Sequence, residues 1–166
     1  QKIHNTGNFA NFLPVMVAAR INLEKNILDS AQYIAILKSI ECFAYRVFLF
    51  DGKRSNAGKS SFYRWAKELF DQGISAQEVV TKIDGLTLYY NSNKDFIAKV
   101  VKPFGWYSRR NLLKYTLFEY EKKLLKEEGH GQPPRITWAD LAKDSTLEHI
   151  FPQNPISKRY WLKDWD

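Results

Sequence analysis

The sequence predicts a mainly α-helical protein, in which a helical bundle-like domain is followed by a short piece of mixed structure. Apolar residues recur every three or four positions along most of the 166 residues, which is the spacing of helices with one buried face. Serine and aspartate stand where these helices would begin, and glycine or proline where they would end. With 45% hydrophobic and 15% aromatic residues, the chain can bury a substantial core.

The strongest predicted helix covers residues 29–50, where Asp29 or Ser30 can cap the first turn. Its apolar positions repeat at helical spacing and are Ile34, Leu37, Ile40, Phe43 or Ala44, and Val47. Residues 45–50 are rich in strand formers, so the end of this helix stays open. An earlier helix is expected over residues 9–23.

Shorter helices follow after a polar loop over residues 51–61. One of the last two serines of this loop starts a helix that reaches Phe70. Ser75 and Glu78 have the spacing of a capping box, which predicts a helix to residue 83 or beyond.

Two more helices complete the first part of the chain. A short helix over residues 95–101 is ended by Pro103, and a long helix is expected over residues 108–128, before Gly129. The predicted apolar face of the long helix consists of Leu113, Leu117, Tyr120 and Leu124.

Residues 129–136 are the one convincing linker, because glycines are followed there by consecutive prolines. They divide the chain into a helical domain, residues 1–128, and a second piece, residues 137–166. The second piece is expected to open with a short helix over residues 138–142.

Composition limits the partners and the compartment. The chain has 25 Lys and Arg residues against 18 Asp and Glu residues, and the resulting net charge of +7 suits a polyanionic partner such as DNA.

The single cysteine, Cys42, excludes an internal disulfide and fits a reducing, cytoplasmic compartment. It is expected to be buried. The longest apolar run, around residues 48–50, is too short to span a membrane. The first residues do not have the pattern of a signal peptide.

The segment TLEHIFPQNP, residues 146–155, carries the strongest functional signal. It places Glu148 beside His149, before an apolar pair and a proline-bounded turn. Hydrolysis of a phosphodiester needs a base that activates water, and a histidine with a reference pKa of about 6.5 suits that task. A divalent ion held by carboxylate oxygens would neutralise the phosphate. Adjacent side chains on a flat strand point to opposite faces, so a shared site requires the strand to bend or end there.

This segment closely resembles the first part of an HNH nuclease motif, in the EHI-x-PQ form found in GmrSD-type modification-dependent restriction endonucleases. The resemblance implies that the second piece begins a ββα-metal (HNH) unit. In that unit His149 would be the general base and Glu148 would hold Mg²⁺ or another divalent metal ion. Pro152 and Gln153 match the family's turn, and Asn154 matches it less closely. The family needs a further helix after this segment, so we expect the chain to be a fragment that is inactive alone.

Two stretches of the helical domain also resemble GmrSD-type proteins. YRVFLFDGKRSNAG matches their apolar helix and Arg-Ser loop through Arg46, Arg54 and Ser55, and RRNLLKYTLFEYEKKL matches the long helix before the nuclease. The implied function is metal-dependent cleavage of DNA in the restriction of foreign or modified phage DNA. The implied partners are DNA and the rest of a longer chain, including an N-terminal domain that senses nucleotide and modified DNA. The oligomeric state stays open.

Basic residues form two groups that could contact DNA phosphates. The loop group consists of Lys53, Arg54 and Lys59. The second group, near the start of the long helix, consists of Arg109, Arg110 and Lys114. Basic groups of this kind are more often a solvated surface than a specific binding site. The alternative function is therefore a non-catalytic helical coupling module or DNA-binding module.

The loop also has some features of a nucleotide-binding P-loop, because Gly52 is followed by Gly58, Lys59 and Ser60. A P-loop has four residues between its glycines, whereas five stand here, in surroundings that look helical. A solvated loop between helices is the favoured interpretation.

Overall fold

The computed structural model describes residues 3, 6, 9–101, 105–127 and 137–143. These residues are mainly helical and include no strand, which confirms the predicted helical character. The chain divides into two compact units, residues 1–116 and residues 117–166.

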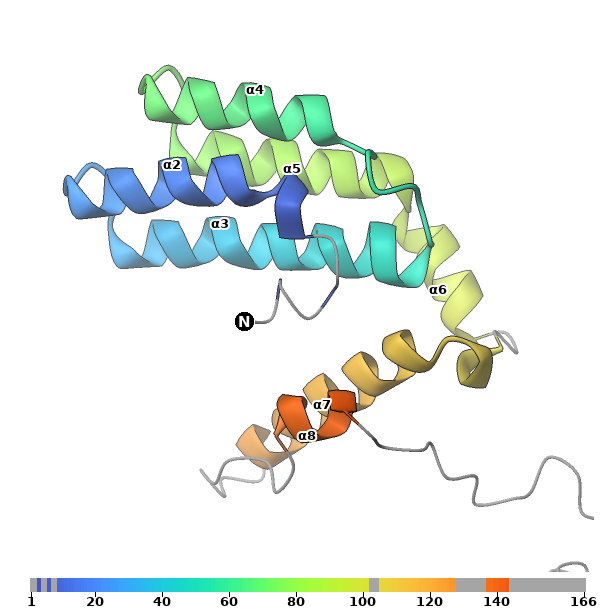
Figure 1. Cartoon of the computed structure of the whole chain (residues 1–166). Coiled ribbons are helices and arrows are strands. Elements are labelled where there is room, and N and C mark those ends of the chain that lie inside the picture. Colours follow the sequence, from blue (N-terminus) through green and yellow to red (C-terminus); the bar gives the residue numbers. More distant parts are fainter. Residues whose placement is uncertain (1–2, 4–5, 7–8, 102–104, 128–136, 144–166) are drawn as a thin grey trace, which may run out of the picture. The chain divides into compact units, whose positions relative to one another are not determined.

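The first unit contains a bundle formed by α2 (Leu13–Glu24), α3 (Ser30–Phe43), α4 (Lys59–Phe70) and α5 (Ala76–Tyr90). A short 3-10 turn, η1 (Phe9–Asn11), precedes α2. In Figure 1, α2 lies beside α4 and α3 lies beside α5. The α2 and α4 helices run in one direction, and α3 and α5 run in the other.

Aromatic rings fill the centre of the bundle. Phe12, Phe43 and Phe62 are fully buried. The Phe62 ring meets the other two edge to face, with centroid distances of 4.9 Å to Phe12 and 5.1 Å to Phe43. Each such pair adds about 0.5–1.5 kcal/mol beyond the burial of its rings. Because the rings come from the start of α2, the end of α3 and the first turn of α4, they hold these helix ends together.

The predicted capping residues of α3 and α5 are confirmed. The Asp29 carboxylate accepts the Gln32 N–H over 2.7 Å, and the Gln32 side chain accepts the Asp29 N–H over 3.0 Å. Ser75 and Glu78 form the same reciprocal pair at the start of α5, over 3.2 and 2.7 Å. The backbone and side-chain hydrogen bonds from Ser75 hold the pKa of Glu78 below its ordinary value. Both capping boxes satisfy N–H groups that a helix start leaves without acceptors.

The start of α4 differs from the prediction. Gly58, and not Ser60 or Ser61, precedes the first turn, and its φ of 74° lies in the left-handed region. Its N–H donates to the Tyr90 hydroxyl over 3.2 Å. Because the residues before this loop are helical, the structure favours a helix–helix loop over a P-loop.

The end of the predicted second helix is a π-helix, η2 (Ala44–Phe50), which continues α3. The Asp51 N–H donates to the Arg46 carbonyl over 3.1 Å, five residues back, so the turn is wider than in an α-helix. Val47, Phe48 and Phe50 are all buried in this segment. The strand-forming residues therefore build a widened helix and no strand.

Two predictions about burial on α3 are wrong. Ile34 is 48% exposed, while Ile36 is fully buried, because the core face of the helix runs through Ile36, Ile40 and Phe43. Cys42 is exposed, because it lies roughly 100° around the helix from the buried Phe43.

The first unit continues through α6 (Asn93–Val101) and the 3-10 turn η3 (Trp106–Ser108) to the start of α7 (Arg110–Glu127). The α6 helix begins earlier than predicted, because the Ser92 hydroxyl accepts the Asp95 N–H over 3.2 Å and caps it.

The buried face of α7 also differs from the predicted one. Leu112 and Tyr115 are its buried residues, and the Tyr115 hydroxyl donates to the Glu41 carboxylate over 3.0 Å. On the predicted face, Leu117 is 50% exposed and Tyr120 is 57% exposed. The sequence carries apolar residues on adjoining stripes of this helix, and periodicity alone does not choose between them.

The second unit holds the rest of α7 together with α8 (Trp138–Lys143). Their rings meet edge to face at Phe118 and Trp138, with centroids 5.6 Å apart. The α8 helix confirms the short helix predicted at residues 138–142. The predicted linker, residues 129–136, lies outside the described residues, and the domain boundary stays a prediction.

Candidate nucleic-acid interface

The structure does not describe the residues predicted to form the nuclease site. These residues are Glu148, His149, Pro152, Gln153 and Asn154. Their roles stay predictions. Within the described residues, no group of three or more His, Cys, Asp or Glu side chains could hold a metal ion. The described geometry therefore bears on how the helical unit could contact a nucleic acid.

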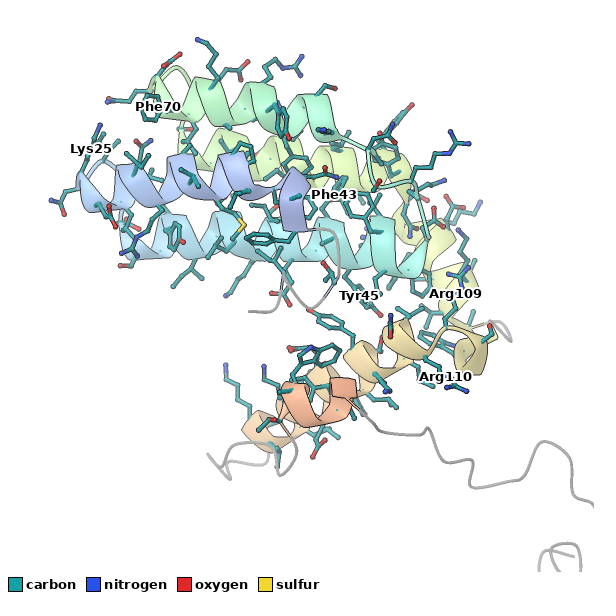
Figure 2. All side chains as sticks on the ribbon, in the orientation of Figure 1. Lys25, Phe43, Tyr45, Phe70, Arg109 and Arg110 are labelled. Atoms are coloured by element: carbon teal, nitrogen blue, oxygen red, sulfur yellow. The ribbon has the colours of Figure 1, made fainter. Side chains whose placement is uncertain are left out.

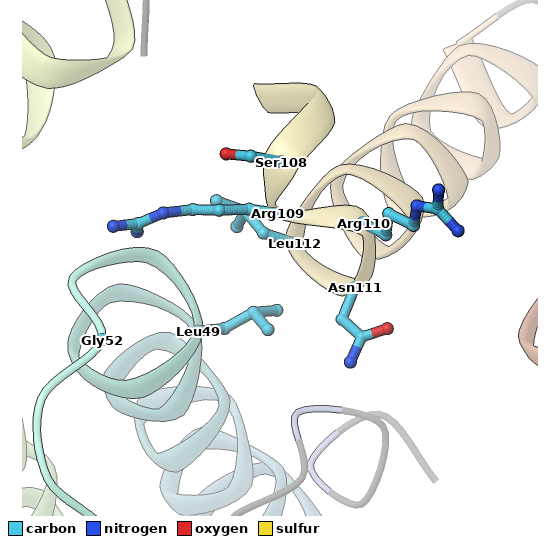
Figure 3. Close-up of a pocket in the computed structure, with 7 residues that line it drawn as sticks. All are labelled: Leu49, Gly52, Ser108, Arg109, Arg110, Asn111 and Leu112. Atoms are coloured by element: carbon cyan, nitrogen blue, oxygen red, sulfur yellow. The ribbon is translucent and has the colours of Figure 1, made fainter. Parts of the chain in front are cut away.

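A pocket of about 470 Å³ lies where η2 ends and α7 begins (Figure 3). Leu49 and Gly52 line it from the η2 side, and residues 108–112 line it from the α7 side. Its lining combines the apolar side chains of Leu49 and Leu112 with arginine, serine and asparagine side chains. Arginine, serine and asparagine side chains are among those that donate hydrogen bonds to phosphate groups.

Arg109 spans the two sides of this pocket. Its Nη1 donates to the carbonyl of Phe50, the last residue of η2, and in Figure 3 its side chain extends across the turn at Gly52. Arg110 extends in a different direction from the first turn of α7. It is exposed and has no ion-pair partner among the described residues. The pocket thus has one arginine anchored to the backbone and one arginine open to solvent.

A buried carboxylate organises the neighbouring loop. Asp51, whose side chain is 6% exposed, pairs with Lys53 over 3.2 Å and also with Lys99 of α6. Burial acts to raise the pKa of Asp51, but the hydrogen bonds from Lys99 and Lys53 outweigh it and hold the pKa below its ordinary value. The charge of Lys53 is therefore partly neutralised by a partner within the fold.

Only the second predicted basic group contributes residues to the pocket. Arg109 and Arg110 line the pocket with Gly52, which directly precedes Lys53. The other predicted residues, Lys53, Arg54, Lys59 and Lys114, do not line it. Arg54 is exposed and Lys114 is half-buried. The Lys59 ammonium lies 5.5 Å from the centre of the Tyr63 ring.

Arg46 has a structural role that the sequence did not indicate. Its Nη2 donates to the Asn91 carbonyl over 2.6 Å, and its Nη1 donates to Asn93 Oδ1 over 2.8 Å. The guanidinium also lies 4.8 Å from the centre of the Phe96 ring, a cation–π distance. Asn91 Nδ2 returns a hydrogen bond to the Arg46 carbonyl over 3.0 Å. These contacts tie η2, which forms one wall of the pocket, to the start of α6.

Comparison with protein-family models gives no match, and neither curated proteins nor solved structures give a significant one. None of the helices in the described part is long and apolar enough to cross a membrane. The likeness to GmrSD-type nucleases therefore rests on the residues quoted from the sequence.

Proposed function

We propose that this chain forms part of a metal-dependent DNA endonuclease of the GmrSD type, which cleaves foreign or modified phage DNA. The observation that carries the proposal is the EHI-x-PQ segment, residues 148–153, in which an acid and a histidine precede a proline turn. The pocket between η2 and α7 supports it, because arginines there offer contacts for a DNA backbone.

The proposed chemistry divides between neighbouring residues. The His149 imidazole takes a proton from the attacking water. Glu148 supplies a carboxylate oxygen, the type of ligand that Mg²⁺ prefers. When bound, the ion would neutralise charge on the scissile phosphate and stabilise the leaving oxygen. Pro152 limits how far a strand continues, which suits a backbone that must turn so that both side chains reach one phosphate.

The pocket is proposed to hold the DNA backbone without taking part in cleavage. Arg109 and Arg110 concentrate positive charge at the start of α7, where the helix dipole also favours a phosphate. Phosphate contacts of this kind fix the position of DNA and carry no sequence information. Recognition of a modified base would then belong to another part of the natural protein.

Nicking of plasmid and phage DNA in Mg²⁺ or Mn²⁺ tests the nuclease proposal. The natural protein that contains this chain is expected to cleave, and His149→Ala is expected to lower the rate by about 100-fold or more, since a general base contributes on that order. Circular dichroism and DNA binding should be unchanged in the variant. Undiminished cleavage by a folded His149→Ala protein would remove the proposed catalytic role.

A second candidate is a non-catalytic helical module that couples domains or binds DNA. The basic pocket favours it, because contacts with phosphates there require nothing from Glu148 or His149. Retained DNA binding without metal-dependent nicking in the natural protein would support this second candidate alone.

A further inference from the structure

An apolar groove of about 430 Å³ lies between α2 and α4. Its walls include Val17, Tyr63 and Phe70, which are 47%, 44% and 48% exposed. Its floor includes Ala18 and Ala66, which are 4% and 7% exposed. Because alanines stand between larger side chains, the two neighbouring helices leave a hollow open to solvent. All of these residues belong to the first unit.

The acidic residues along these two helices are already neutralised. Each pairs with a cation of its own helix, over distances of 2.8, 3.8 and 2.6 Å, in the pairs Arg20–Glu24, Arg64–Glu68 and Lys67–Asp71. They therefore contribute little net charge to the groove.

Two lysines remain without a carboxylate partner in the described residues, and they mark the ends of the groove. The Lys59 ammonium lies 5.5 Å from the centre of the Tyr63 ring, and the Lys25 ammonium lies 5.6 Å from the centre of the Phe70 ring. Figure 2 shows Lys25 and Phe70 at the same end of the bundle. The two rings that the lysines approach, Tyr63 and Phe70, are about 10 Å apart along α4 at 1.5 Å per residue.

We propose that this groove binds an acidic amphipathic helix of a partner protein. The lining residues span about two helical turns on each helix, which fits the apolar face of a helix with side chains at positions i, i+4 and i+7. The lysine at each end selects a carboxylate near each end of that helix. DNA could pair with the lysines, but its phosphates would make no favourable contact with the apolar walls. The combination of apolar surface and positive charge therefore favours a protein helix over DNA. This site is independent of the proposed nuclease activity.

A designed peptide tests the site. The probe is a fluorescent helical peptide of about 16 residues, with leucines on one face and glutamates near both ends. Its matched control carries lysines in place of the glutamates. Anisotropy titrations of the full chain are expected to show at least tenfold tighter binding of the acidic peptide. Val17→Asp should weaken that binding, because it places a charge on the apolar wall.

Charge reversal provides the second arm. Lys25→Glu combined with Lys59→Glu is expected to reverse the preference, so that the lysine peptide binds better. Lys38→Glu, which makes the same change at an exposed position of α3, should leave the preference unaltered. Circular dichroism checks that each variant is folded.

Several results would overturn the proposal. These are equal binding of both peptides, no binding of the acidic peptide, or an unchanged preference after charge reversal. A dimer of the chain that Val17→Asp dissociates would place a second copy in the groove. Binding of vesicles containing phosphatidylserine that displaces the peptide would indicate a membrane surface instead.

Discussion

Gly58 occupies a position that suits no other residue. Its φ is 74°, and a Cβ at this position would lie 3.0 Å from Leu86 Cδ2 and 3.2 Å from Phe43 Cζ. Gly52 also has a positive φ, 66°, but a Cβ there would meet nothing within 4 Å. A substitution at Gly52 would therefore carry only the cost of the left-handed backbone, whereas one at Gly58 would also carry the cost of crowding.

Gly58→Ala is expected to lower the free energy of unfolding by about 2–4 kcal/mol, the combined cost of a left-handed alanine and of crowding in the core. Gly52→Ala should lower it by only about 1–2 kcal/mol, because the backbone conformation is its sole cost. Urea unfolding followed by circular dichroism measures both values. Equal losses would mean that Leu86 and Phe43 move aside without cost.

The local signals in the sequence predicted the starts of α3 and α5, but not those of α4 and α6. Asp29 with Gln32 and Ser75 with Glu78 lie three residues apart, so both partners of each capping box are visible in the sequence. The widened turn of η2 was not predictable in this way. Its Arg46 contacts residues 91 and 93, which lie 45 and 47 positions along the chain. Tertiary contacts of this kind decide between helix and strand where local propensity is ambiguous.

The sequence also predicted the residue types of the candidate site better than their contacts in the fold. The cations at Arg109 and Arg110 are visible in the sequence, but their approach to Gly52 depends on the hydrogen bond from Arg109 to Phe50, 59 positions away. Lys59 does not line this pocket, and its ammonium lies 5.5 Å from the centre of the Tyr63 ring, so its predicted phosphate contact stays a prediction. The EHI-x-PQ segment stays a prediction of sequence alone.

Asp51 links the end of η2 to the loop and to α6 through Lys53 and Lys99. Asp51→Asn keeps the shape of the side chain and removes its charge, and we expect it to lower the free energy of unfolding at neutral pH by about 1–2 kcal/mol. The expected loss is smaller than for a fully buried ion pair, because the lysine side chains are 45% and 43% exposed.

The pH dependence of that loss follows from the lowered pKa of Asp51 in the folded protein. A carboxyl of this kind stabilises the fold fully above its unfolded pKa of about 3.9, and the stabilisation is lost as the pH falls through the lower folded pKa. The difference between wild type and variant should therefore be constant above about pH 5 and should close at more acidic pH. Urea unfolding over this range measures it. A difference that persists at about pH 2 would show that the charge is not its cause.

The chain as a whole carries a net charge of +7, which attracts any polyanion and complicates a test of the pocket. Binding to DNA that arises from overall charge falls with salt in proportion to the number of phosphates contacted. Removal of one cation anywhere on the surface weakens such binding slightly. A specific contribution from the pocket must therefore exceed the effect of an equal charge removed elsewhere.

Arg110→Ala and Lys38→Ala supply this comparison, because each removes one exposed positive charge that has no ion-pair partner in the described residues. If the pocket holds a DNA phosphate, Arg110→Ala should weaken binding of a labelled duplex by about five- to tenfold at low salt. It should also reduce the slope of log K against log salt by about 1. Lys38→Ala should change neither quantity beyond a small amount. Fluorescence anisotropy over a series of salt concentrations measures both. Equal effects of the two substitutions would assign DNA binding to the net charge and would contradict a phosphate contact at the start of α7.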